Sequence, residues 1–333
     1  MRREYDLETL AQQHGFSITE IDKVCRISDL LESVSAVKFL SDRLSLYGGT
    51  AFTFIYAPEI LRLSVDLDFN YRHIDTTDWG AVRKEIDKKL KDLLYRLGYA
   101  KEDVAIDPHY PLQRFAVSYV NTLGLKDKFN VEIGYLKRFP ILKNDTLADF
   151  KHLGTQETFK TKTPSKEELF ANKWCTLLYR ESSRDLFDIY QIADIEFNVE
   201  AFRKSAIIDS LTHVKPKIYE ITASALRRIP VDSRLTNLLQ TERIAEYNFP
   251  EIRRDVEEFT EMHLSSITPN EIRAVDRFYD ELVLDPNVID GTGLFHERTS
   301  EYPAALWTLE KIKKGAVVDF ERTDFSGMLN HHV

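Results

Sequence analysis

The stretch that decides the fold runs from residue 44 to residue 68 and reads LSLYGGTAFTFIYAPEILRLSVDLD. It opens on the apolar segment Leu44–Tyr47, which is typical of a short strand. Two glycines, Gly48 and Gly49, then stop that strand, because they allow backbone conformations that other residues avoid. The residues 51–56 that follow are compatible with a helical turn. The pattern therefore predicts a strand, a tight turn and a short helix.

A second strand is expected over residues 64–71, where apolar and polar residues alternate. This alternation predicts that Asp66 and Asp68 emerge on the same face of the strand. Paired carboxylates of this kind are hard oxygen ligands that suit magnesium, and two ions can hold the attacking and leaving oxygens of a phosphoryl displacement. The glycine turn offers backbone N–H groups to phosphate oxygens, and Thr50 adds a hydroxyl. Each feature alone is also typical of an ordinary turn or a solvated strand, but their order within 21 residues indicates a site for a nucleoside triphosphate and its metal.

Outward from this stretch, the sequence predicts a mixed α/β fold with a helical second half. Helices are expected over residues 7–13, 17–40 and 78–97, and further strands over residues 114–120 and 129–136. Strand patterns fade after Pro164, and the chain to about residue 314 reads as successive helices interrupted by prolines. We therefore expect a domain over residues 1–163 and a mainly helical domain over residues 164–333.

Composition limits the classes of function. The 333 residues carry a formal charge of −9, which argues against a protein coated for general nucleic-acid binding. Residues 121–184 nevertheless hold 12 Lys and Arg against 8 Asp and Glu, which is compatible with a polyanion held locally.

No apolar run is long enough to span a membrane, and the polar N-terminus does not resemble a secretory signal, so we expect a cytoplasmic protein without a membrane partner. Cys25 and Cys175 lack a zinc-ligand spacing and are expected to be buried apolar residues.

Three blocks of the sequence resemble one known family. They are Leu46–Phe52 with its Gly-Gly-Thr-Ala turn, Arg62–Phe69 with Arg-x-Ser-x-Asp-x-Asp, and a downstream Lys helix followed by an Asp pair within residues 173–189. These blocks resemble the AbiEii/AbiGii-type abortive-infection nucleotidyltransferase toxins, a group that includes MenT-like proteins and belongs to the polymerase-beta-like nucleotidyltransferase superfamily. The resemblance implies a polymerase-beta-like core, with a mixed sheet flanked by helices, followed by a mainly helical C-terminal domain.

The resemblance also implies roles for individual residues. Asp66 and Asp68 become the metal-binding pair, and a third metal-binding carboxylate is expected from a later strand at Glu132, whose alternative interpretation is an exposed strand glutamate. Nucleotide and phosphate binding falls to Gly48, Gly49, Thr50, Arg62, Ser64, Arg180 and Asp188. The implied cofactor is Mg²⁺, as two ions, with Mn²⁺ as a substitute.

The last block contains Lys173 and Arg180, which are seven residues apart and so share a helix face. Asp185 and Asp188 share a face in the same way. Without the resemblance, these four residues are typical of surface ion pairs on helices. With it, Lys173 contacts the triphosphate or the base, Asp185 is the better candidate for an essential carboxylate, and Asp188 orients Lys173 or Arg180.

The implied reaction is magnesium-dependent transfer of a nucleoside monophosphate from a nucleoside triphosphate to an acceptor. By resemblance, the acceptor is the 3′ end of transfer RNA, the biological consequence is growth arrest, and the partner is a separately encoded antitoxin. Two alternatives stay open at this stage. One is transfer to a protein hydroxyl or a small molecule, and the other is a non-catalytic regulator that binds a nucleoside triphosphate.

Overall fold

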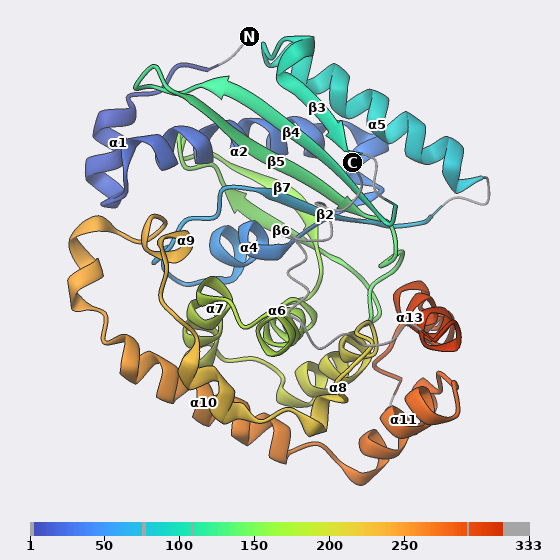
Figure 1. Cartoon of the computed structure of the whole chain (residues 1–333). Coiled ribbons are helices and arrows are strands. Elements are labelled where there is room, and N and C mark those ends of the chain that lie inside the picture. The colour runs from blue at the N-terminus through green and yellow to red at the C-terminus, as the bar shows by residue number, and fades with distance from the viewer. Residues whose placement is uncertain (1–2, 75–77, 108–109, 292, 316–333) are drawn as a thin grey trace. The chain divides into compact units, whose positions relative to one another are not determined.

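The computed structural model describes residues 3–74, 78–107, 110–291 and 293–315 (Figure 1). The described chain divides into two compact units. Unit 1 comprises Met1–Pro140, Asn144–Leu169 and Ser233–Tyr247, and unit 2 comprises Ile141–Lys143, Phe170–Asp232 and Asn248–Val333. The domain boundary expected between residues 163 and 164 remains a prediction.

Unit 1 is built on a five-stranded sheet with the strand order β1-β2-β5-β4-β3. Strands β2 and β5 pair in parallel, and the other neighbours are antiparallel. The sheet is therefore mixed, as expected. Its strands are β1 (Leu44–Tyr47), β2 (Leu67–Tyr71), β3 (Val104–Asp107), β4 (Leu112–Val120) and β5 (Lys126–Gly134).

The two faces of this sheet differ in polarity. Phe115 and Val117 of β4 and Phe129 and Val131 of β5 are at most 1% exposed, and they lie on one face. The residues between them along each strand are polar or small and more exposed, and they lie on the other face. We call these the apolar face and the polar face. The alternation in sequence thus fixes which side of the sheet joins the core.

Helices α2 (Ile18–Ala36) and α5 (Trp79–Arg96) lie against the apolar face. Arg26 of α2 stacks on Tyr119 of β4 at 3.9 Å from the ring centroid, and Arg83 of α5 donates to Gln113 of β4 at 2.6 Å. Both helices were expected from apolar spacing. The Ser17 side chain caps the start of α2 by accepting a hydrogen bond from Glu20 N. The remaining helical segments of unit 1 are α1 (Leu7–His14), α3 (Lys38–Ser41), α4 (Gly48–Ala51), a π-helix (Phe52–Tyr56), short 3₁₀ turns (Lys101–Asp103, Thr241–Glu246), α9 (Ser233–Thr236) and the first residues of α6 (Lys166–Arg180).

The second strand is shorter than the sequence predicts. The alternation suggested a start at Ser64, but β2 begins at Leu67. The preceding residues pair elsewhere, because Arg62 forms an isolated bridge with Leu239 and Leu63 N donates to Leu238 O at 2.8 Å. Asp66 therefore lies just before the strand and not within it.

A hairpin of β6 (Thr146–Lys151) and β7 (Thr158–Thr163) completes unit 1 and was not predicted. Lys162 of β7 donates to the carbonyl of Asp42, next to β1. Only one residue of β6, Phe150, is fully buried, so the sequence pattern there is weak.

Unit 2 is helical, in agreement with the fading of strand patterns after Pro164. Its core gathers Trp174, Phe202, Phe259 and His263, whose rings lie 4.3–6.1 Å apart where they contact. Its helices are the remainder of α6, α7 (Ser183–Ala193), α8 (Val199–Ser210), α10 (Phe249–Ser265), α11 (Pro269–Asp280), α12 (Pro286–Ile289) and α13 (Pro303–Lys313), with 3₁₀ turns at Ile218–Glu220, Ala223–Arg228 and Thr299–Glu301.

Cys25 and Cys175 are both buried, as the sequence predicted. Among the described residues, no helix combines the length and the apolar character needed to cross a membrane.

Candidate active site

The turn between β1 and α4 requires glycine at its first position. Gly48 has a φ of 68°, in the left-handed region that favours glycine. A Cβ at this position would lie 2.2 Å from Asp68 Oδ2. The backbone of the turn therefore passes directly against the carboxylate of Asp68, and a side chain here would displace it.

The second glycine is packed as closely. A Cβ on Gly49 would lie 2.7 Å from Ser64 Oγ and 3.2 Å from an Arg62 Nη atom. Thr50, which is fully buried, has its Oγ1 3.0 Å from Ser64 Oγ and also contacts the carbonyl of Asp66. Because a hydroxyl has one proton, Thr50 donates to that carbonyl and accepts from Ser64. The predicted phosphate-binding residues of unit 1 thus form one contiguous group around the turn.

The carboxylates lie beside this group. Asp68 faces Glu132 across the parallel pair β2–β5, and residues opposite each other in a sheet project to the same side. Both side chains are partly exposed on the polar face. Asp66 lies at the adjacent edge, where its Oδ1 accepts from Asn130 N of β5 at 2.9 Å. The structure therefore brings together the three carboxylates that the sequence singled out.

Arg114 belongs to the same group and was missed by sequence reasoning. It faces Glu132 across β4–β5, and its Nε donates to Glu132 Oε1 at 2.6 Å. The sequence predicted a strand over residues 114–120, but only the strand register of the structure places Arg114 next to Glu132. Asn130, whose N–H holds Asp66, was missed for the same reason.

Asp66 is one of the charges that act on a further acidic residue, Glu20. Burial raises the pKa of Glu20, Lys23 lowers it, and the charges of Asp127 and Asp66 raise it again. Lys23 lies 3.1 Å from Asp127. This end of the sheet is thus rich in carboxylates, and a cation that binds here is electrostatically favoured.

In unit 2, Lys173 of α6 pairs with Asp188 of α7. The Nζ–Oδ2 distance is 2.9 Å, and the two side chains are 8% and 0% exposed. A buried pair of this kind is held by its mutual attraction, because either charge alone would be costly in the interior. Asp188 is thus the residue that orients Lys173.

Asp185 is held by Arg180 and Ser182. Arg180 contacts both carboxylate oxygens, at 2.7 and 2.8 Å, and Ser182 Oγ donates to one of them. Ser182 also caps α7 by accepting from Asp185 N. Asp185 is 1% exposed, so its carboxylate is enclosed by these donors, whereas the side chain of Arg180 is 34% exposed.

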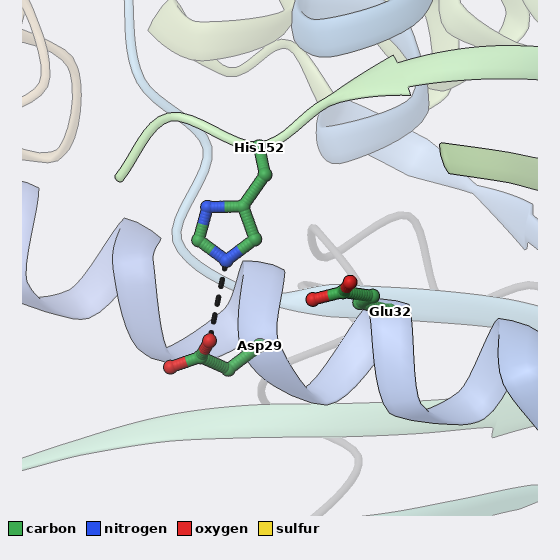
Figure 2. A group of neighbouring side chains, drawn as sticks. All are labelled: Asp29, Glu32 and His152. Atoms are coloured by element: carbon green, nitrogen blue, oxygen red, sulfur yellow. Dashed lines mark hydrogen bonds and ion pairs between the residues drawn. The ribbon is translucent and has the colours of Figure 1, made fainter. Parts of the chain in front are cut away.

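One other group in unit 1 has the composition of a metal site. Figure 2 shows Asp29 and Glu32 of α2 with His152, whose ligand-type atoms lie within 4.8 Å of one another. The N-terminal segment already occupies it: Arg3 pairs with Asp29 and Glu32, and Tyr5 Oη donates to Asp29 at 2.7 Å.

The tautomer of His152 also argues against a metal at this group. Its Nδ1 accepts from the N–H groups of Gly154 and Thr155, at 3.0 and 3.3 Å, so the proton is on Nε2 and points to Asp29. A protonated ring nitrogen has no lone pair for a metal. The group fastens the N-terminal segment to α2.

The carboxylates of the polar face are the other candidate ligands for a divalent cation in unit 1. Their donors are all oxygens, as Mg²⁺ and Mn²⁺ prefer. One oxygen of Asp66 is fixed by a backbone N–H and one oxygen of Glu132 by Arg114, which orients both groups. Supporting contacts of this kind are typical of metal-binding carboxylates.

Comparison with known proteins identifies the family and a similar fold. The family described as "Nucleotidyl transferase AbiEii toxin, Type IV TA system" matches residues 29–281. Among solved structures, MenT4, a nucleotidyltransferase toxin from Mycobacterium tuberculosis H37Rv, is similar in fold, with a TM-score of 0.61 and 18% identity, over 92% of this chain and 99% of that one. A search of curated proteins gave no match.

The protein is therefore a nucleotidyltransferase. More specifically, the chain belongs to the AbiEii nucleotidyl transferase toxin family, the toxins of a type IV toxin–antitoxin system. The resemblance inferred from the three sequence blocks is confirmed, as is the expected fold class. Membership of such a system implies an antitoxin partner and a nucleoside triphosphate substrate.

Proposed function

We propose that the protein transfers a nucleoside monophosphate from a nucleoside triphosphate to the 3′ end of transfer RNA, with Mg²⁺ bound by Asp66, Asp68 and Glu132. The observation that supports this most directly is the alignment of Asp68 and Glu132 on the polar face, against the turn at Gly48. Mn²⁺ is expected to substitute, because it accepts the same oxygen ligands.

When bound, Mg²⁺ would neutralise charge on the triphosphate and activate the attacking hydroxyl. Asp66, Asp68 and Glu132 would hold these ions and through them align the acceptor hydroxyl with the triphosphate. The acceptor oxygen forms a bond to the α-phosphorus, the bond to the β-phosphate oxygen breaks, pyrophosphate leaves, and the hydroxyl proton passes to solvent. Positioning and charge stabilisation account for most of the catalysis in reactions of this type.

The turn residues bind the phosphates. The first N–H groups of a helix lack partners within it, so those that begin α4 are suited to phosphate oxygens. The hydroxyl of Ser64 and the guanidinium of Arg62 flank the turn and complete this role. Because Gly49 has no side chain, Ser64 and Arg62 can lie directly against the turn.

We assign Lys173 to the triphosphate or the base, as the family resemblance implies, with Asp188 fixing its position. Asp185 acts through Arg180, which it orients by a two-point contact. Arg180 is then the group of this pair that contacts phosphate.

The transfer RNA acceptor rests on the family resemblance and on the excess of Lys and Arg in residues 121–184. The test is incubation of the purified protein with Mg²⁺, each α-labelled nucleoside triphosphate in turn, and total transfer RNA. Asp68→Asn serves as the control, because it retains the size of the side chain and removes its charge. Label that enters RNA only with the wild-type protein supports the proposal.

Other outcomes of this assay point to the alternatives. Label in the protein or in a small-molecule fraction keeps the mechanism and refutes the RNA acceptor. Binding of a nucleoside triphosphate without release of pyrophosphate, with any acceptor, indicates a regulator. Equal labelling of RNA by Asp68→Asn and by the wild type refutes the assignment of the metal site.

A further inference from the structure

The polar face continues beyond Glu132 onto the outer strands of the sheet, and it is open there. Ala105 of β3, Ser118 of β4 and Lys128 of β5 are exposed on it. On the opposite face of the same strands, Val117 and Phe129 are at most 1% exposed. One side of these strands is therefore core and the other is available to a ligand.

Two cations border this open surface. Arg114 faces Glu132, and Lys128 faces Ser118, in the register of β4 and β5. Because a strand rises about 3.3 Å per residue, Lys128 lies about 13 Å along β5 from Glu132. The surface thus extends away from the carboxylates in one direction, with a cation at each end.

The donors of both cations remain available. Nε of Arg114 donates to Glu132, but its terminal Nη atoms make no hydrogen bond to any residue that the structure describes. Within the same described residues, Nζ of Lys128 makes no ion pair or hydrogen bond. Asn130 and Ala116 lie between the two cations, so the centre of the surface is a polar amide and a small side chain.

We propose that this surface, formed by Arg114, Ala116, Ser118, Lys128 and Asn130, binds the phosphodiester backbone of the acceptor, a single-stranded RNA 3′ end. Lys and Arg with Asn and Ser are the side chains that commonly contact phosphates and do not read bases. A surface that tracks the backbone with cations is the usual way to bind single strands without sequence preference. The inference rests on the proposed function, since it assumes an RNA acceptor.

The carboxylates on the same face set a condition for binding. Asp68, Glu132 and Asp107 lie in one row with Arg114, and their charges repel phosphate. A divalent cation held by Asp68 and Glu132 offsets two of these charges, after which Arg114 and Lys128 dominate locally. RNA binding is therefore expected to be stronger with Mg²⁺ than with a chelator.

Lys128→Gln is the direct test. Its affinity for a labelled single-stranded RNA, measured by fluorescence anisotropy with Mg²⁺, is expected to fall roughly threefold to tenfold, because one phosphate contact is lost. The plot of the logarithm of the RNA association constant against the logarithm of salt concentration should become less steep by about 0.7, the value for one phosphate contact to a single strand. In transfer assays the loss should appear in KM for RNA.

Lys88→Gln is the matched control. Lys88 is an exposed lysine of α5, the helix that packs on the apolar face. Its substitution removes the same charge from the opposite side of the sheet, so affinity, salt slope and KM should remain at wild-type values.

Arg114 is tested with two substitutions, because it also orients Glu132. Arg114→Lys keeps a cation for phosphate but loses the Nε bond, so RNA affinity should be retained while kcat falls. Arg114→Gln should lose RNA affinity as well.

The outcomes separate the two proposals. If the wild type labels RNA and Lys128→Gln matches it in affinity, salt slope and KM, this surface is refuted and the proposed function stands. If the wild type neither binds nor labels RNA, the RNA acceptor fails, and the surface assignment fails with it. An equal loss in Lys88→Gln would attribute the effect to net charge and overturn the inference.

Discussion

Substitution of Gly48 by alanine should lower the rate of nucleotidyl transfer about 100-fold while leaving the protein folded. The new Cβ would lie 2.2 Å from Asp68 Oδ2, whereas ordinary contact begins at 3.4 Å, so the carboxylate must shift by about 1.2 Å. A displacement of about 1 Å at a reacting centre lowers the rate by about 100-fold. The left-handed conformation at φ 68° costs a non-glycine residue a further 1–2 kcal/mol of stability, roughly.

Gly124→Ala is the control for the cost of the left-handed backbone conformation alone. Gly124 has a φ of 76°, and a Cβ there would meet nothing within 4 Å. This variant should lose a similar 1–2 kcal/mol, roughly, in urea unfolding and keep its activity. Both variants are compared by incorporation of an α-labelled nucleotide. If Gly48→Ala transfers nucleotide at a rate within threefold of the wild type, the close packing of the turn against Asp68 is not needed for catalysis, and our account of the site is wrong.

Two further predictions concern unit 2. Asp188→Ala leaves Lys173 charged and buried, so the free energy of unfolding in urea should fall by about 3–5 kcal/mol. The double variant Lys173→Met with Asp188→Leu should recover much of that stability, because it leaves no unpaired charge in the interior. The double variant should remain inactive if Lys173 contacts the triphosphate, whereas full activity would assign the pair a purely structural role. Burial, with a smaller effect of the Arg203 charge, lowers the pKa of His263 from 6.5 to about 4. Between pH 4 and pH 6.5, the unfolded chain therefore binds more protons than the folded chain. Stability should therefore fall by up to about 3 kcal/mol as the pH drops from 6.5 to 4. His263→Phe should remove this component in unfolding measured across that range, and an unchanged pH dependence would contradict it.

Much of the architecture followed from local patterns. The apolar spacing of residues 17–40 and 78–97 predicted helices that appear as α2 and α5, with a break in the first at Val37. The strand patterns along residues 114–120 and 129–136 predicted strands that appear as β4 and β5. These features depend on neighbours within a few residues, which a sequence pattern records directly.

The hairpin of β6 and β7 and the short strand β3 were not found in the sequence. Strand β3 has four residues, none of them buried, and β6 has one buried residue. Such strands form because a partner strand supplies hydrogen bonds, and a weak pattern does not identify that partner.

The sequence by itself determined the chemical groups of the candidate site: the glycine turn, the Asp-x-Asp pair and the downstream lysine and aspartates. Only the tertiary structure decided how they are used. Strand register placed Arg114 against Glu132, the bridge from Arg62 to Leu239 left β2 to begin only at Leu67, and packing of α7 on α6 paired Lys173 with Asp188. These contacts join residues that are distant along the chain, and they depend on which strands and helices become neighbours, so no local pattern specifies them.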